Sequence, residues 1–135
     1  MSFLGIDYGA KRIGIAVSGS GEIATAHSVL RNEGDVAAKV AALGEELEAE
    51  TYVVGIARRA HSASGEQRFR DFAERLRQKT CKEVVLWDEA LTTVEAAERL
   101  RAEGRNRRDA EREIDMVAAA VILQSYLDDR ARRAS

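Results

Sequence analysis

Several acidic residues stand where a carboxylate could bind a metal ion. Asp7 lies inside an apolar segment, Asp88 and Glu89 directly follow the apolar run Val84 to Trp87, and Asp115 precedes a run of small apolar residues. An ionised carboxylate removed from water needs a cation or several hydrogen-bond donors. Mg²⁺ prefers such hard oxygen ligands. Two of these ions about 3.5 to 4 Å apart can activate water and stabilise the leaving oxygen of a phosphodiester.

Each acid also has an ordinary structural explanation. Asp7 could start a turn by accepting hydrogen bonds from backbone amides near Gly9. Asp88 and Glu89 could form the polar end of a strand, and Asp115 could favour a helix start through the helix dipole. The metal interpretation therefore depends on whether the fold brings acids from separate elements together.

Strands are predicted around these acids. Phe3 to Ile6 and Ile13 to Val17 are apolar runs on either side of a tight turn, and Ile23 to Leu30 alternates loosely, which predicts an antiparallel meander. Thr51 to Ile56 is β-branched and aromatic, and Val84 to Trp87 is wholly apolar. A short, wholly apolar run is typical of a strand covered on both faces in a parallel sheet. Ligands collect at the carboxyl ends of such strands.

Helices are predicted between and after the later strands. Asn32 is expected to cap the first helix, while Ser64 and Thr92 stand three residues before a Gln or Glu and are expected to begin the next two. The last helix is expected from about Asp109 to Leu127. The predicted buried stripes are Val36, Val40, Leu43 and Leu47, then Phe69, Phe72, Ala73 and Leu76, then Ile114, Val117, Ala118, Val121 and Ile122. The order β-β-β-α-β-α-β-α-α predicts an α/β fold.

The composition excludes a disordered chain and a bulk polycation. The 135 residues are 45% hydrophobic and 33% charged, with 21 Lys and Arg against 23 Asp and Glu. Charge is nevertheless separated along the chain, because residues 58–79 carry seven basic residues and three acids, whereas residues 33–50 carry six acids and one Lys. This separation favours a polyanionic partner. Aromatic residues are only 5%, so we expect the nucleic-acid backbone and shape to be recognised.

Cysteine content and hydropathy bear on the compartment. A lone cysteine, Cys81, forms no internal disulfide and fits a reducing environment. The longest apolar run, Met116 to Leu123, is too short to span a bilayer. We therefore expect a cytoplasmic protein without membrane contacts.

Four motifs, in order and spread over nearly the whole chain, resemble the YqgF family: Gly5 to Ser18, Val53 to Gly55, Asp88 to Thr93, and Ile114 to Leu127. Members of this family are bacterial proteins described as candidate Holliday junction resolvases and pre-16S rRNA nucleases. The resemblance implies an RNase H-like fold with a five-stranded mixed sheet flanked by helices. It implies one nuclease domain over residues 1–129. Residues 130–135 are rich in arginine and stand at the end of the chain, so we expect them to form a basic, disordered tail.

The resemblance also implies that Asp7, Glu89 and Asp115 are both the catalytic set and the ligands of Mg²⁺ or Mn²⁺, with Asp88 in support. Basic residues near these acids are the expected substrate-binding residues: Lys11, Arg12, Arg58, Arg59, Arg107 and Arg108. The chain departs from the family pattern at Ala90, where members usually have Arg. It departs again at residues 56–65, where members usually have Leu-Pro and a loop containing Asn and Gly.

Two functional hypotheses follow. The first is a metal-dependent endonuclease acting on structured RNA or branched DNA, in pre-16S rRNA processing or Holliday junction resolution. The second is a non-catalytic nucleic-acid-binding factor in rRNA maturation or transcription. Gly5 to Gly14 also resembles the first phosphate-binding hairpin of actin-like kinases, but 135 residues leave no room for the second domain that such kinases need. The sequence leaves open RNA against DNA and monomer against homodimer.

Overall fold

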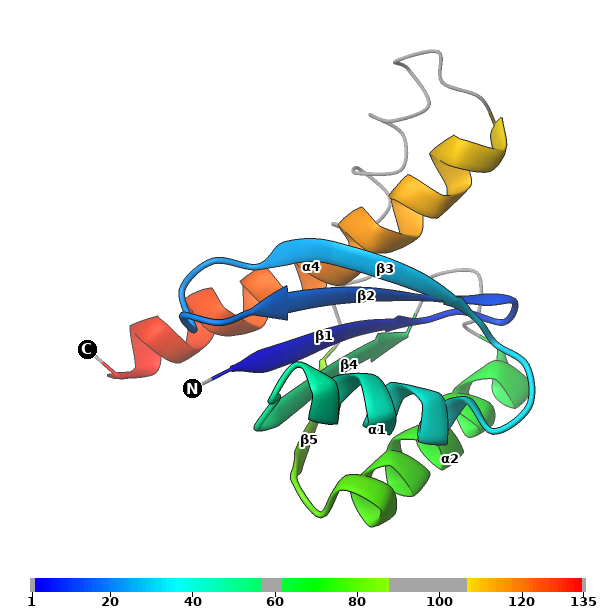
Figure 1. Ribbon diagram of the computed structural model, residues 1–135, viewed down its shortest axis with the longest axis horizontal. Helices are drawn as coiled ribbons and strands as arrows, with labels where there is room; N and C mark the ends of the chain where they lie inside the picture. Colours follow the sequence, from blue (N-terminus) through cyan, green and yellow to red (C-terminus); the bar gives the residue numbers. More distant parts are fainter. Residues whose placement is uncertain (1, 57–61, 88–106, 135) are drawn as a thin grey trace.

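A five-stranded mixed sheet lies at the centre of the structure, with helices on both faces (Figure 1). The structure is a computed structural model and describes residues 2–56, 62–87 and 107–134. The strands are β1 (Phe3–Tyr8), β2 (Arg12–Ser18), β3 (Thr25–Arg31), β4 (Thr51–Ile56) and β5 (Glu83–Trp87). Their order is β3-β2-β1-β4-β5, in which β1, β2 and β3 pair antiparallel and β4 and β5 add in parallel. The predicted meander and mixed sheet are confirmed.

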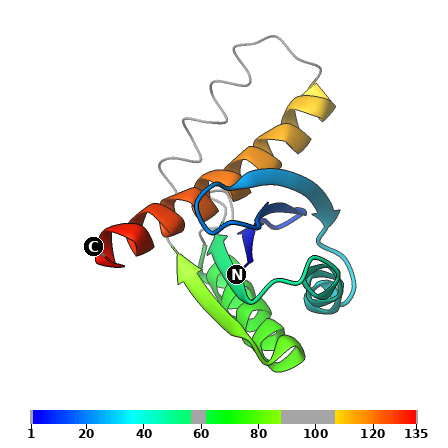
Figure 2. The same cartoon turned by 60° about the vertical axis from the view of Figure 1, so that its left-hand side comes forward.

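The helices form a layer on each side of this sheet. α1 (Val36–Glu46) and α2 (Ala63–Thr80) pack together on one face, and α4 (Arg107–Ala134) crosses the other face (Figures 1 and 2). No helix in the described ranges has the length and apolar character that a bilayer crossing requires. The helix predicted to start at Thr92 lies outside the described residues.

Strand alternation assigns each side chain of β1 to one of two cores. Leu4, Ile6 and Tyr8 pack in the core beneath α1 and α2. Phe3 packs in the second core, beneath α4. Gly5 also faces α4, because a Cβ atom built on it would meet Leu123 and Ala119 of that helix. Because successive strand residues point to opposite faces, Asp7 shares the α4 face with Phe3 and Gly5.

Three glycines on this face let α4 lie close to the sheet. A Cβ atom at Gly14 would lie 1.9 Å from the carbonyl oxygen of Asp115. A Cβ at Gly5 would lie 2.6 Å from Cβ of Leu123, and one at Gly55 would lie 2.6 Å from Cδ1 of Ile122. Real Cβ atoms do not approach other atoms so closely, so larger side chains at these positions would push the helix away.

Two of the three predicted helix caps were wrong by two or three residues. Asp35, not Asn32, caps α1, because its carboxylate accepts from the backbone N–H of Ala38 at 3.2 Å. The Asn32 side chain instead donates to the carbonyl of Gly9 at 2.9 Å and so ties the end of β3 to the β1–β2 turn. Ser62, not Ser64, caps α2. The buried residues predicted for α2 are confirmed.

Strand β5 differs from its prediction as a strand covered on both faces. It is the last strand of the sheet, with β4 on one side only. The side chain of Leu86 is 44% exposed, and Val85 and Trp87 are only partly buried. An apolar strand at the end of a sheet and an apolar strand in its centre have similar sequences. The hydrophobicity of a strand does not show how many strands or helices lie beside it.

The C-terminal segment is helical to Ala134, whereas a disordered tail was predicted from residue 130. Asp129 forms ion pairs with Arg132 and Arg133, three and four residues later, and these pairs support a helical last turn. Arg130 lies over the ring of Phe3, with its guanidinium carbon 5.2 Å from the ring centroid. This contact links the tail to the first strand.

Candidate metal and nucleic-acid site

Asp7 is a buried acid near the carboxyl end of β1. Its exposed fraction is 3%, although both neighbours along the strand are apolar. The strand register places it level with Gly14 of β2 and Gly55 of β4. Glycine on both sides brings α4 close to the sheet beside Asp7, and the carboxylate therefore lies in the sheet–helix interface rather than in solvent.

Asp115 reaches the same place from helix α4. Its carbonyl oxygen lies over Gly14, and Gly14 is the register partner of Asp7. Paired residues of antiparallel strands have Cα atoms about 4.5 to 5.5 Å apart. The fold therefore places the backbone of Asp115 against the register partner of Asp7, although the two acids are far apart in sequence.

Arg12 forms an ion pair with Asp115, which the sequence did not predict. Its Nε donates to Oδ2 of Asp115 at 2.6 Å, and the two side chains are 28% and 14% exposed. Arg12 precedes Gly14 by two residues in β2, so both point toward α4. That period-two relation was the one signal in the sequence that could have placed Arg12 beside α4.

The end of β5 aligns with Asp7 across the sheet. Gly55 pairs with Asp7 on one side and with Trp87 on the other. The indole Nε1 of Trp87 donates to Oγ of Ser125 at 3.2 Å, which fixes this strand end against α4. Glu89 follows Trp87 by two residues and lies outside the described residues, as does Asp88.

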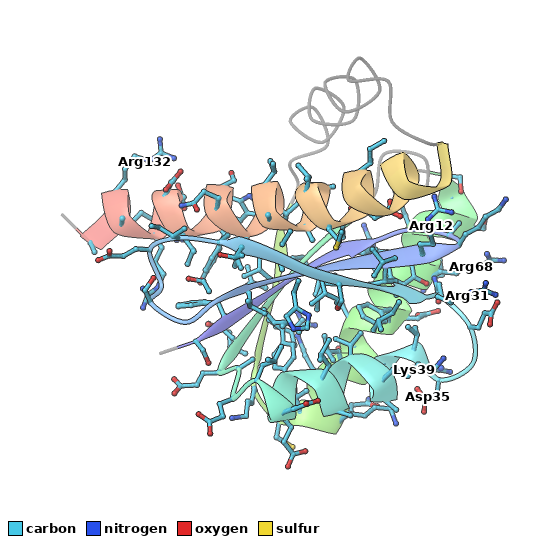
Figure 3. All side chains as sticks on the ribbon, turned by 45° about the horizontal axis from the view of Figure 1, so that its top comes forward. Arg12, Arg31, Asp35, Lys39, Arg68 and Arg132 are labelled. Atoms are coloured by element: carbon cyan, nitrogen blue, oxygen red, sulfur yellow. The ribbon has the colours of Figure 1, made fainter. Side chains whose placement is uncertain are left out.

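Three of the other five predicted substrate-binding residues lie within the described ranges. Lys11 is exposed in the β1–β2 turn, and Arg107 and Arg108 lie in the first turn of α4. Figure 3 shows Arg12, Arg31 and Arg68 at one end of the sheet and Arg132 at the opposite end. Arg58 and Arg59 lie outside the described residues.

The described residues include two of the three acids of the metal hypothesis. Asp7 and Asp115 supply hard carboxylate oxygens, which suit Mg²⁺ or Mn²⁺. Among residues 2–56, 62–87 and 107–134, no group of three His, Cys, Asp or Glu side chains gathers as a metal site. The third ligand that the family resemblance implies, Glu89, is outside these ranges, and the two described acids fit the hypothesis without completing it.

Comparison with known proteins gives one consistent family. Residues 1–129 match the model of a family described as RuvX: Holliday junction resolvase. A relative from Nitratidesulfovibrio vulgaris is 38% identical over 134 residues, covering 95% of this chain and 94% of its own. A relative from Anaeromyxobacter is 42% identical over 137 residues, covering 96% and 98%. Both are named as candidate pre-16S rRNA nucleases.

Solved structures support the fold assignment. Thermus thermophilus RuvC in complex with a Holliday junction substrate superposes with a TM-score of 0.59 at 16% identity, covering 97% of this chain and 96% of that one. The fowlpox virus Holliday junction resolvase superposes with a TM-score of 0.58 at 12% identity, covering 96% and 99%. The fold is RNase H-like, as the sequence resemblance implied.

Proposed function

The chain belongs to the RuvX family, also called YqgF, of Holliday junction resolvases, and on this premise we propose that it is a metal-dependent endonuclease acting on structured nucleic acid. The observation that carries the proposal is the meeting of Asp7 and Asp115 at Gly14. A buried carboxylate beside a second carboxylate is costly unless a cation is present. Divalent cations supply that charge and the chemistry of phosphodiester hydrolysis together.

Asp7 and Asp115, joined by Glu89, would hold the metal ions. Bound Mg²⁺ or Mn²⁺ supplies an activated water and a positive charge on the leaving oxygen. Asp7 is fixed by the sheet, since its strand pairs on both sides, and Asp115 is fixed by the close contact of α4 with Gly14. Two ligands held rigidly on different elements would meet the requirement of a catalytic metal site for a fixed geometry.

Arg12 has two roles in this proposal. Its ion pair with Asp115 offsets carboxylate repulsion before nucleic acid binds. Because its side chain is still 28% exposed at the end of the sheet where Asp7 lies, it also offers a cation to a backbone phosphate. We therefore still propose that Arg12 binds substrate, and we add that it contacts Asp115, a proposed metal ligand.

Precursor 16S rRNA is the substrate that we propose first, because relatives with 38% and 42% identity over nearly the full chain carry that name. A four-way DNA junction is the second candidate, because the family description names it. The protein would act on either as a monomer or homodimer, with Mg²⁺ or Mn²⁺ and without membrane contacts, in the cytoplasm.

The direct test compares cleavage of a precursor rRNA fragment and of a four-way DNA junction by the wild type and by Asp7→Asn. We expect the variant to lose at least about a hundredfold in rate. Asp128→Asn is the matched control, because Asp128 is an exposed acid on α4. Equal cleavage by the wild type and Asp7→Asn would overturn the proposed site and indicate a contaminating nuclease.

The non-catalytic alternative makes a different prediction in the same assay. A binding factor would hold these substrates in a salt-sensitive complex and cleave neither of them at any Mg²⁺ or Mn²⁺ concentration. Its binding would also survive replacement of Asp7 and Asp115 by the corresponding amides.

A further inference from the structure

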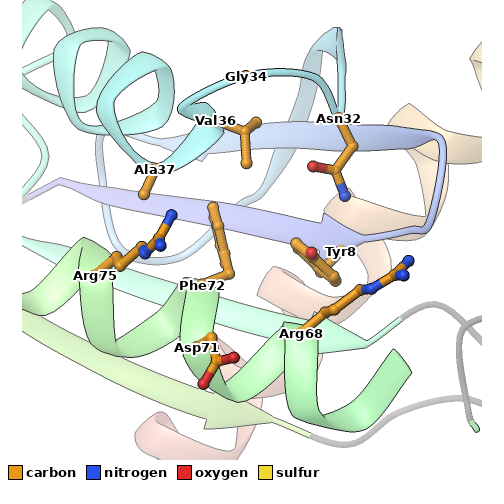
Figure 4. Close-up of a pocket in the computed structure, with 9 residues that line it drawn as sticks. All are labelled: Tyr8, Asn32, Gly34, Val36, Ala37, Arg68, Asp71, Phe72 and Arg75. Carbon is orange, nitrogen blue, oxygen red and sulfur yellow. The ribbon is translucent and has the colours of Figure 1, made fainter. Parts of the chain in front are cut away.

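A pocket of about 210 Å³ lies on the other face of β1 from Asp7 (Figure 4). It opens between the start of α1, the connection that leads into it, and the exposed side of α2. Tyr8 and Phe72 form its apolar part, and Asn32, Arg68 and Arg75 supply polar groups. None of these residues belongs to the acidic site described above.

Tyr8 brings a hydroxyl group to this pocket. The residue is 6% exposed, and its ring centroid lies 4.9 Å from that of Phe72 and 6.2 Å from that of Phe69. The phenol oxygen makes no hydrogen bond with any described residue. The hydroxyl is therefore open to a ligand in the pocket, although it is not among the fully buried polar atoms that lack a partner.

The charged groups around the pocket favour an anion. Arg68 and Arg75 are exposed residues that form no ion pair with another described residue. The one acid in the lining is Asp71, which accepts from Nε2 of Gln67 at 2.9 Å. Two guanidinium groups and one hydroxyl face the Asp71 carboxylate of the lining, and Arg75 also lies close enough to Asp35 to help lower the pKa of that carboxyl.

The pocket and the acidic site lie on opposite faces of the sheet, both near the carboxyl end of β1. Tyr8 directly follows Asp7, and alternation sends their side chains to opposite faces. The β1–β2 turn forms the rim between them, with Lys11 and Arg12 on it, and Asn32 fixes that turn by donating to Gly9. A nucleic-acid strand that passes over this rim would meet Lys11 and Arg12 between the two sites.

We propose that this pocket binds a backbone phosphate of the nucleic acid whose scissile bond lies at Asp7, an inference that rests on the proposed function. The planar forks of Arg68 and Arg75 suit phosphate oxygens. Because Tyr8 and Asp7 are neighbours on β1 and point to opposite faces, the strand would have to pass around the end of β1 between this phosphate and the cleaved bond. The pocket therefore sets the path of the strand.

Binding is measured in Asp7→Asn protein, which leaves the nucleic acid intact, with a fluorescently labelled precursor rRNA fragment and a labelled four-way DNA junction. Replacing Arg68 and Arg75 together by Ala is expected to raise Kd about tenfold and to lower the salt slope by about one. Arg70→Ala is the matched control, because it removes an exposed arginine of α2 that does not line the pocket, and we expect less than about a twofold change.

Two further changes separate a phosphate site from a structural effect. Asp71→Asn keeps the acceptor for Gln67 but removes the negative charge, so it is expected to lower Kd about threefold. A neutral methylphosphonate linkage, moved one position at a time along the strand, is expected to weaken wild-type binding at one position. At that position the same linkage is expected to leave the Kd of the Arg68 and Arg75 double variant unchanged.

The outcomes distinguish this proposal from the proposed function. If the double variant binds like Arg70→Ala, or if every neutral linkage affects wild type and double variant equally, the pocket does not bind a phosphate, whatever the cleavage assay shows. If binding depends on the pocket but wild-type protein cleaves nothing, the pocket proposal holds and the nuclease proposal fails. In an active enzyme the double variant raises KM and leaves kcat within about twofold.

Discussion

At Gly14 the backbone of α4 rests directly on the sheet, and this contact determines whether Asp115 reaches Asp7. Gly14 is paired with Asp7 between β1 and β2. The Asp115 carbonyl of α4 occupies the space that a side chain at Gly14 would fill. The glycine is required by this close approach and not by its backbone angles, since its φ is not positive. Its role is therefore to position the two acids.

Gly14→Ala is expected to lower the free energy of unfolding by about 2 to 3 kcal/mol, because the added methyl overlaps the Asp115 backbone. Activity is expected to fall further than stability, because α4 shifts together with Asp115. Gly19→Ala is the control, since a Cβ at Gly19 meets no atom within 4 Å, and we expect a change below about 1 kcal/mol. Urea unfolding of the two variants checks this, and similar losses in both would contradict it.

Arg12 competes with a metal ion for Asp115, because both are cations and the guanidinium already lies 2.6 Å from one carboxylate oxygen. Arg12→Gln is therefore expected to raise the affinity for Mn²⁺ about threefold to tenfold in protein free of nucleic acid. Titration calorimetry with Mn²⁺ measures it. A weaker affinity in Arg12→Gln would show instead that Arg12 orients Asp115 for the metal.

The sequence singled out Asp7 and Asp115 as candidate site residues but did not predict their contacts. Asp7 stood out because a carboxylate inside an apolar strand is costly, and Asp115 because of the family motif. The Arg12 ion pair and the contact at Gly14 depend on how α4 crosses β2, which no local pattern records. Glu89 stays a prediction, since it lies outside the described residues.

At the scale of elements, Asp35 joins α1 to α2. It caps α1, and Nζ of Lys79 in the last turn of α2 lies 3.1 Å from its Oδ2. The hydrogen bond from Lys79, followed by the one from the Ala38 amide, holds the pKa of Asp35 below its ordinary value. The cap was assigned three residues too early from sequence, because Asn32 and Asp35 are both good capping residues and the fold uses Asn32 elsewhere.

The lowered pKa of Asp35 predicts a pH effect with a definite sign. A carboxylate whose pKa is lower in the folded state stabilises the fold above its unfolded pKa of about 3.9, and this contribution is lost as pH falls through the folded pKa. Asp35→Asn keeps a capping group but no charge, so the wild type is expected to be more stable at pH 6, with the difference closing below about pH 4.

Thermal unfolding from pH 7 to 3 measures this difference, and about 1 M NaCl is expected to reduce it because Lys79 and Asp35 are partly exposed. Asp35→Ala is the companion variant, since it loses the cap as well and is expected to lower Tm by a further few degrees, about 3 °C, at every pH. A wild-type advantage that is constant across the pH range would contradict the assignment.

The sheet and its helix layers were the most predictable part of the structure, because each strand and helix carries its own periodicity. Residues 51–56 and the buried stripe of α2 match their predictions directly. The sequence did not predict that β5 is the last strand of the sheet or that the helix α4 continues to Ala134. Both depend on what lies beside the element, which a pattern within the element does not contain.

At the scale of the whole molecule, the proposed metal site joins the two layers that meet on the α4 face. Asp7 belongs to the central strand, and Asp115 belongs to the helix that crosses β1, β2 and β3. A metal ion bound by both acids exists only in the folded arrangement. Its binding free energy therefore adds to the stability of the whole fold.

Because metal binding is coupled to folding, Mn²⁺ is expected to stabilise the protein. At a concentration of Mn²⁺ about a hundred times its Kd, a site that exists only in the folded protein adds about 2.7 kcal/mol to stability. Wild-type Tm is expected to rise by about 5 to 10 °C, whereas Asp7→Asn and Asp115→Asn gain at most a third as much. The readout is the metal-induced change in Tm, so any effect of a substitution on the metal-free protein cancels.

Asp128→Asn, on the same helix but outside the site, is expected to respond to Mn²⁺ like the wild type. If all four proteins gain equally, Mn²⁺ binds elsewhere and the two acids are not its ligands. If Asp7→Asn alone loses the response, Asp115 serves Arg12 rather than the metal, and the ion pair at 2.6 Å is then a structural contact between β2 and α4. A loss in both single variants means that the metal connects sheet and helix, because either ligand alone is then insufficient.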